Sequence, residues 1–152
     1  MIKREMYISR IRDFINTDLV KILTGIRRSG KSVMLELIKE ELVKQGISPS
    51  NFIHINFENL KNIELYDYIK LHEYILDKIK GIKGKAYLFL DEIQEVEAWQ
   101  KCVNSLRVNS DTDIYVTGSN AKLLSGEFAT FLAGRYVEFV IYPFSFSEFM
   151  DI

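Results

Sequence analysis

The sequence predicts an α/β fold with a mainly parallel sheet of five strands flanked by helices. Three observations support this prediction. Segments of strand type and helix type alternate five times along the chain, as they do where crossover helices join parallel strands. Residues 85–90 are nearly all apolar, which is typical of a strand buried on both faces of a parallel sheet. A glycine-containing loop separates the first predicted strand from the first long predicted helix.

The individual elements follow from apolar spacing and from turn residues. The expected strands cover residues 19–24, 52–57, 85–90, 113–117 and 136–142. The expected helices cover residues 3–15, 33–45, 69–79, 99–106 and 124–132. We therefore expect a single domain over residues 1–152, with an N-terminal helix over residues 1–15.

The composition is that of a globular protein. Of the 152 residues, 47% are hydrophobic and 27% are charged, which excludes a disordered chain. The formal net charge of −1 gives no bulk electrostatic attraction to nucleic acids. The single Cys102 rules out a disulfide within the chain and is compatible with a reducing compartment. No apolar run approaches the ~18 residues of a membrane span, and no signal-peptide core follows Met1, so we expect a soluble, cytoplasmic protein.

The strongest functional signal is the loop at residues 25–32. It matches the phosphate-binding pattern G-x-x-x-x-G-K-[ST] at every fixed position, between a strand and a helix. Gly25 and Gly30 allow a tight turn whose N–H groups point at an anion, and the following helix adds the positive end of its dipole. In such a loop Lys31 reaches the β- and γ-phosphates, and the hydroxyl of Ser32 is a ligand of Mg²⁺. The alternative explanation is a glycine turn that binds nothing. We assign nucleotide binding to Gly25, Ile26, Arg27, Arg28, Ser29, Gly30, Lys31, Ser32 and Val33.

A second motif, residues 87–92, is an apolar strand that ends in two acids. In nucleotide hydrolases an aspartate at this place, here Asp91, holds Mg²⁺. An adjacent glutamate, here Glu92, can orient and deprotonate the attacking water. Two acids that simply end a strand at the surface are the structural alternative. Residues 120–123 lack the aspartate of the base-reading motif of GTPases, and small-molecule kinases often lack the glutamate. The motif therefore favours hydrolysis of ATP.

Two weaker candidates lie at the ends of other predicted strands. Residues 117–120, Thr-Gly-Ser-Asn, stand at the end of the fourth strand, at the edge where α/β sheets bind ligands, so a polar side chain there can report the γ-phosphate. Capping of the next helix by Ser119 or Asn120 explains the element equally well. Arg135 precedes the fifth strand, and an arginine near a γ-phosphate stabilises charge in the transition state. On spacing alone, a solvated arginine is the simpler interpretation.

Five segments together resemble the prokaryotic AAA-type ATPases of the AAA+ superfamily. They are residues 25–32, 88–94, 117–124, 132–135 and 142–149. The resemblance implies an additional-strand P-loop fold with strand order 5-1-4-3-2. It also implies that Glu92 is the hydrolytic glutamate, that Ser119 or Asn120 is the sensor, and that Arg135 is an arginine finger or sensor. Family members continue well past the last motif, so we expect residues 1–152 to be the ATPase core, without the C-terminal lid and further domains.

The sequence thus predicts a core that binds ATP and Mg²⁺ and couples hydrolysis to an unknown partner or a DNA-related process. Its catalytic residues would be Lys31, Glu92, Asn120 and Arg135, with Ser32 and Asp91 on the metal. The alternative is a nucleotide-gated interaction or DNA-binding module with little turnover. A homo-oligomer is compatible with the resemblance, as is a DNA or protein partner reached through the missing C-terminal region. We expect weak activity in this short form and no membrane partner.

Overall fold

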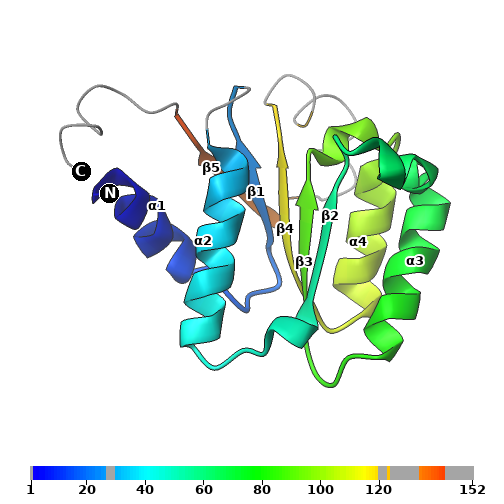
Figure 1. Ribbon diagram of the computed structural model, residues 1–152, viewed down its shortest axis with the longest axis horizontal. Helices are drawn as coiled ribbons and strands as arrows, with labels where there is room; N and C mark the ends of the chain where they lie inside the picture. Colours follow the sequence, from blue (N-terminus) through cyan, green and yellow to red (C-terminus); the bar gives the residue numbers. More distant parts are fainter. Residues whose placement is uncertain (1, 27–29, 120–122, 124–133, 143–152) are drawn as a thin grey trace.

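The computed structural model contains one parallel sheet between two layers of helices (Figure 1). It describes residues 2–26, 30–119, 123 and 134–142. The strands are β1 (Val20–Thr24), β2 (Phe52–Asn56), β3 (Ala86–Asp91), β4 (Thr112–Gly118) and β5 (Tyr136–Val140). They pair in the order β2-β3-β4-β1-β5, and every pair is parallel. Read from β5 to β2, this is the predicted order 5-1-4-3-2, so the fold class and the topology are confirmed.

Helices cover both faces of the sheet. They are α1 (Ile2–Arg12), α2 (Lys31–Lys44), α3 (Tyr68–Lys80) and α4 (Trp99–Asn109). Helices α1 and α2 lie on one face, and α3 and α4 lie on the other (Figure 1). Three short 3-10 helices, η1 (Pro49–Asn51), η2 (Leu60–Tyr66) and η3 (Ile93–Glu95), were not predicted from the apolar spacing. The helix predicted over residues 124–132 lies outside the described residues.

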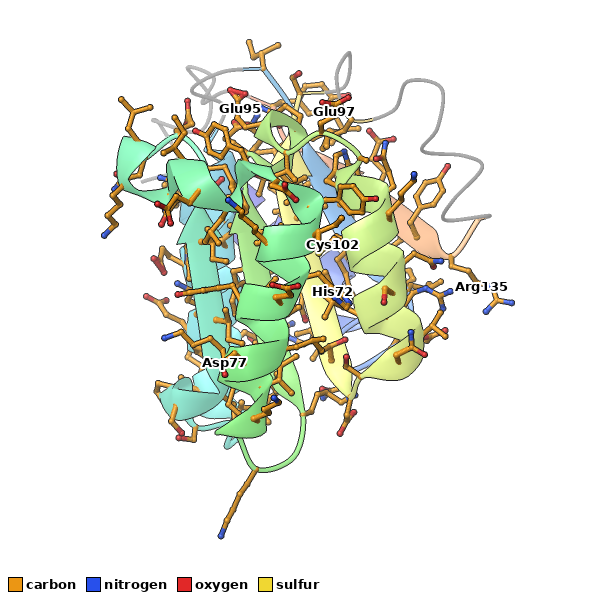
Figure 2. All side chains as sticks on the ribbon, turned by 90° about the vertical axis from the view of Figure 1, so that its right-hand side faces the viewer. His72, Asp77, Glu95, Glu97, Cys102 and Arg135 are labelled. Carbon is orange, nitrogen blue, oxygen red and sulfur yellow. The ribbon has the colours of Figure 1, made fainter. Side chains whose placement is uncertain are left out.

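Two apolar cores hold the layers together, one on each side of the sheet. The core under α3 and α4 includes Ile22, Leu88 and Leu90 from the strands. The core under α1 and α2 includes Leu23 and Phe89. All six residues of β3 are buried, which confirms the prediction of a strand covered on both faces. Cys102 lies between α3 and α4 (Figure 2) and is buried in the first core. Burial raises the pKa of its thiol to about 12.

A buried ion pair lies beside the second core. Lys21 of β1 and Asp113 of β4 are both fully buried and pair with each other. The Lys21 ammonium also donates to the carbonyl of Thr17 at 2.9 Å. The second oxygen of Asp113 accepts from the Tyr115 hydroxyl at 2.7 Å and from the N–H of Asn16 at 3.0 Å. Burial lowers the pKa of Lys21 and raises that of Tyr115. Because these groups satisfy one another, the cluster fixes the linker between α1 and β1 to the sheet.

The parallel sheet has two chemically different edges. The carboxyl ends of β3, β4 and β1 lie side by side at one edge and end at Asp91, Gly118 and Thr24. The opposite edge carries Arg135, whose carbonyl accepts from the N–H of Val20 at 3.1 Å, at the start of β1. Ligands of open α/β sheets bind at the carboxyl edge, so this edge carries the candidate functional site.

Candidate functional site

The phosphate loop joins β1 to α2 at this carboxyl edge. Gly30 is the N-cap of α2 and has φ 97°, a left-handed conformation that favours glycine. The side chain of Lys31, the first residue of α2, is 5% exposed, and its Nζ donates to the carbonyl of Gly25 at 2.9 Å. Ile26 and Val33 are exposed at the rim. The predicted binding residues Arg27, Arg28 and Ser29 lie outside the described residues.

Asp91, the last residue of β3, connects the loop to the neighbouring strand. One carboxylate oxygen accepts from the Ser32 hydroxyl at 2.7 Å. The other oxygen accepts from the Thr117 hydroxyl of β4 at 2.6 Å. The structure therefore brings the predicted metal residues Ser32 and Asp91 into direct contact, although they are far apart in the sequence.

The donor set of Ser32 and Asp91 fits Mg²⁺. A hydroxyl and a carboxylate are hard oxygen ligands, and Mg²⁺ is usually held by one or two protein oxygens together with phosphate and water. Within the described ranges, no group of three or more His, Cys, Asp or Glu side chains gathers into a metal cage. The two oxygens are thus suited to a metal that arrives with a nucleotide.

Glu92 forms an ion pair with Lys31, the lysine of the loop. Its Oε1 is 3.1 Å from Lys31 Nζ, and its side chain is 12% exposed. Its Oε2 accepts from Gln94 Nε2 at 3.0 Å. The backbone of Glu92 is left-handed, with φ 59°, and its N–H donates to the Thr117 hydroxyl at 2.9 Å. A left-handed conformation costs a non-glycine residue about 1–2 kcal/mol, and such strain persists where the surroundings enforce it.

Some members of the site were not predicted as such. Thr117 bonds both acidic residues, since its hydroxyl donates to the carboxylate of Asp91 and accepts from the backbone N–H of Glu92. Thr24, which directly precedes the loop, donates through its hydroxyl to Glu138 of β5 at 2.6 Å. Gln94 is bonded to the carboxylate of Glu92. Thr117 begins the candidate element at the end of the fourth strand, and Gln94 falls inside a segment quoted for the family resemblance.

The weaker candidates from the sequence are Ser119, Asn120 and Arg135, and the two that the structure describes do not gather at one place. Ser119 follows β4 at the carboxyl edge, and its carbonyl accepts from the N–H of Leu123 at 2.9 Å, a helix-type contact that fits capping as well as sensing. Asn120 lies outside the described residues. Arg135 lies at the opposite edge of the sheet from Lys31, and Figure 2 shows its side chain pointing outward, away from the edge that Glu95 and Glu97 mark. Its guanidinium is 60% exposed and 3.8 Å from the carboxylate of Asp18.

The fold and the contacts at its carboxyl edge define a phosphate-loop domain of the α/β class. A family model described as "AAA domain" matches residues 17–150. The chain belongs to this family, whose members have a nucleotide-binding, ATPase-type function. A solved structure titled "The cytoplasmic domain of EssC" superposes with a TM-score of 0.51 at 12% identity, covering 84% of this chain and 31% of that one. At this identity the likeness shows the shared fold alone.

Curated relatives are longer than this chain. An uncharacterized protein of Haemophilus influenzae is 49% identical over 150 residues, which are 99% of this chain and 38% of that protein. An uncharacterized protein of Methanocaldococcus jannaschii is 41% identical over 133 residues, which are 86% of this chain and 28% of that protein. The chain thus spans well under half of the length of either relative. Across the described residues, the model has no helix of the length and apolarity that crossing a membrane requires.

Proposed function

We propose that this domain binds ATP together with Mg²⁺ at the carboxyl edge of its sheet and hydrolyses it. The observation that carries the proposal is a continuous set of contacts. Lys31 contacts Glu92, Ser32 contacts Asp91, and Thr117 contacts both acids. A phosphate-binding loop, a metal-type oxygen pair and a carboxylate that can act as a base therefore lie within a few hydrogen bonds of one another.

Each residue has a separate task in this proposal. Lys31 and the N–H groups at the start of α2 bind the triphosphate. Ser32 and Asp91 hold Mg²⁺, which neutralises charge on the phosphates when it is bound. Glu92 accepts a proton from the attacking water. Thr117 orients the Asp91 carboxylate and the backbone turn at Glu92, because its hydroxyl bonds the carboxylate of one residue and the N–H of the other.

A phosphate group and Glu92 compete for Lys31 in this arrangement. The ammonium of Lys31 is 3.1 Å from Glu92 Oε1, and a γ-phosphate that takes up the same ammonium replaces this contact. The carboxylate then becomes available to water next to the phosphorus that is attacked. Binding of the triphosphate would thus itself release the base, so the base becomes available only when a γ-phosphate is present to be attacked.

Arg135 enters the proposal as a residue that acts on a neighbouring copy. It lies at the edge opposite the phosphate loop, and within the described part of the chain its guanidinium pairs with Asp18, an exposed carboxylate 3.8 Å away. A surface pair of this kind contributes little, so the guanidinium is free to serve the site of a second subunit. We propose a homo-oligomer on this basis, and a cytoplasmic location on the basis of the single buried thiol.

We propose that the ATP cycle acts on a DNA or protein partner. The relatives extend far beyond the part that this chain matches, and contacts with a DNA or protein partner would lie in that extra length. The alternative function, a nucleotide-gated module with little turnover, shares the same binding site. The two differ in turnover and not in binding.

Phosphate release and ATP affinity test the proposal together. Lys31→Ala should lose most of the affinity for ATP, measured by calorimetry with Mg²⁺. Lys44→Ala, at the exposed other end of the same helix, is the matched control and should bind as the parent does. Unchanged affinity in Lys31→Ala would remove the phosphate-loop assignment. Tight binding without measurable phosphate release in the parent would establish the alternative.

A further inference from the structure

We propose that Gln94 is a positioning residue for Glu92, which it holds ready for the attacking water. This inference rests on the proposed function, and it adds a residue that the sequence motifs do not assign. Gln94 belongs to η3, two residues after Glu92, and its Nε2 donates to Glu92 Oε2 at 3.0 Å.

A bound phosphate would leave the Glu92 carboxylate with fewer partners. The described side chains make two contacts with the Glu92 carboxylate, one from Lys31 to Oε1 and one from Gln94 to Oε2. A phosphate competes for the lysine and not for the amide. Gln94 is therefore the contact that stays when the base has to act. It keeps the carboxylate from turning freely at the moment when Lys31 is withdrawn.

The chemistry of an amide suits this task. A cation beside a carboxylate favours its charged form and weakens it as a base. The N–H of Gln94 is a neutral donor, so it orients the carboxylate and stabilises its negative charge less than a cation does. Of the two partners, the amide is thus the one compatible with proton transfer.

The other end of the amide shows that packing alone does not explain Gln94. Its Oε1 is buried and has no hydrogen-bond partner among the described residues. Because Nε2 is committed to Glu92, this oxygen faces the carboxyl end of β4, where a Cβ added to Gly118 would lie 2.3 Å from it. A buried acceptor without a partner is unfavourable. An apolar side chain of similar length would fill the space without that cost, so the donor is the part that matters.

The tight contact with Gly118 also fixes where the amide lies. Gly118 ends β4, and the added Cβ would also meet Leu123 at 2.6 Å. Gln94 is therefore held between Glu92 on one side and the end of the strand that carries Thr117 on the other. Movement at the end of β4 would reach the carboxylate of Glu92 through this side chain, in addition to the bond from the Glu92 N–H to Thr117.

The test compares Gln94→Met, which keeps the length and removes the donor, with Gln100→Met. Gln100 is a matched control because it is buried on α4 and also has a buried Oε1 without a partner among the described residues. ATP turnover, affinity for a non-hydrolysable ATP analogue and melting temperature are measured for both. We expect Gln94→Met to lower kcat roughly 10–10²-fold, the scale of a misplaced catalytic group, with unchanged analogue affinity. Gln100→Met should keep the parental kcat.

A double-variant cycle separates positioning from a general structural effect. If Gln94 acts through Glu92, adding Gln94→Met to Glu92→Gln should lower kcat no further. Should Gln94→Met melt below the assay temperature, Gln94→Leu takes its place, since it also removes the donor and adds no charge. Three outcomes would overturn this inference and leave the proposed function standing. They are an equal loss of kcat from Gln94→Met in the parent and in Glu92→Gln, an equal loss of kcat in Gln100→Met, and a parental kcat in Gln94→Met. A parent without turnover, or Glu92→Gln with parental turnover, overturns the proposed function as well.

Discussion

Lys31 Nζ lies 3.1 Å from Glu92 Oε1, so the cation of the phosphate loop and the acid that follows β3 form a nearly buried ion pair. The proposed function gives both groups a role in nucleotide chemistry. In this structure they are paired with each other. Gly25 adds its carbonyl to the lysine, and Gln94 adds its amide to the glutamate. In the proposed function, a bound triphosphate therefore has to replace Glu92 as the partner of Lys31.

Glu92→Gln should tighten ATP binding and slow hydrolysis. The amide no longer competes with the phosphates for Lys31, so we expect affinity to rise by about tenfold, equivalent to ~1.4 kcal/mol. Turnover should fall about 10²-fold or more, because the base is lost. Calorimetry with a non-hydrolysable analogue and a phosphate-release assay measure the two effects. Glu95→Gln changes an exposed neighbouring acid and should alter neither. Weaker binding in Glu92→Gln would mean that the ion pair does not oppose the nucleotide.

Thr117→Val should destabilise the fold, although it preserves the shape of the side chain. The change leaves the buried N–H of Glu92 without its acceptor and removes a donor from Asp91. The expected loss is about 1–3 kcal/mol in the free energy of unfolding, measured by urea denaturation. Thr117→Ser retains the hydroxyl and should lose much less. Equal losses in the two variants would assign the effect to the missing methyl group and not to the hydrogen bonds.

Arg135→Ala should abolish any rise of specific activity with protein concentration. Arg135 is on the far edge of the sheet from Lys31, so it can reach a phosphate only in a neighbouring subunit. An arginine finger raises the rate by ~10³–10⁵. Turnover per subunit is measured across a wide concentration range, and Lys83→Ala, an exposed cation at the same edge, serves as the control. A brisk rate that is independent of concentration and of Arg135 would show that the core needs no neighbour.

The stability of the parent should fall in alkaline solution partly because of Cys102. Burial raises the pKa of its thiol to about 12 in the folded protein, whereas an unfolded thiol titrates near ~8.5. Above that pH the unfolded state has lost a proton that the folded state keeps, so the free energy of unfolding decreases as the pH rises. The expected slope from this residue is up to about 1.4 kcal/mol per pH unit.

Urea denaturation at about pH 7.5 and pH 9.5, under reducing conditions, measures this slope. Cys102→Ala creates a small cavity and should be less stable at the lower pH. Between the two values it should nevertheless lose about 1.4 kcal/mol less than the parent, because it has no thiol to ionise. Parallel slopes for the two proteins would contradict the assignment.

The fold and the central acids were predictable because their signals are local. The loop around Gly30, the apolar run of β3 and the two acids after it are each contained in a short stretch. A parallel sheet then brings its carboxyl ends to one edge without further information. For this reason Lys31, Ser32, Asp91 and Glu92 could be assigned before their contacts were known.

The contacts of Thr117 and Gln94 were not predictable in the same way. Whether the Thr117 hydroxyl meets Asp91 depends on the register of β3 against β4, in which Leu90 lies opposite Val116. No short sequence pattern specifies this register. The left-handed turn at Glu92 is also not signalled by its residue type, since glycine or asparagine usually occupies that conformation. Lys21 interrupts an apolar strand and is explained only by Asp113, which lies on a different strand.

The Lys21–Asp113 pair also bears on how this sequence can change over time. Loss of either partner alone leaves a buried charge uncompensated, at a cost of about 3–5 kcal/mol, which is a large part of the stability of an ordinary domain. Replacement of both by apolar residues is tolerated far better. The two positions are therefore expected to be inherited as a unit, lysine with aspartate or two apolar residues. Mixed intermediates should be rare in lineages that keep this strand pairing.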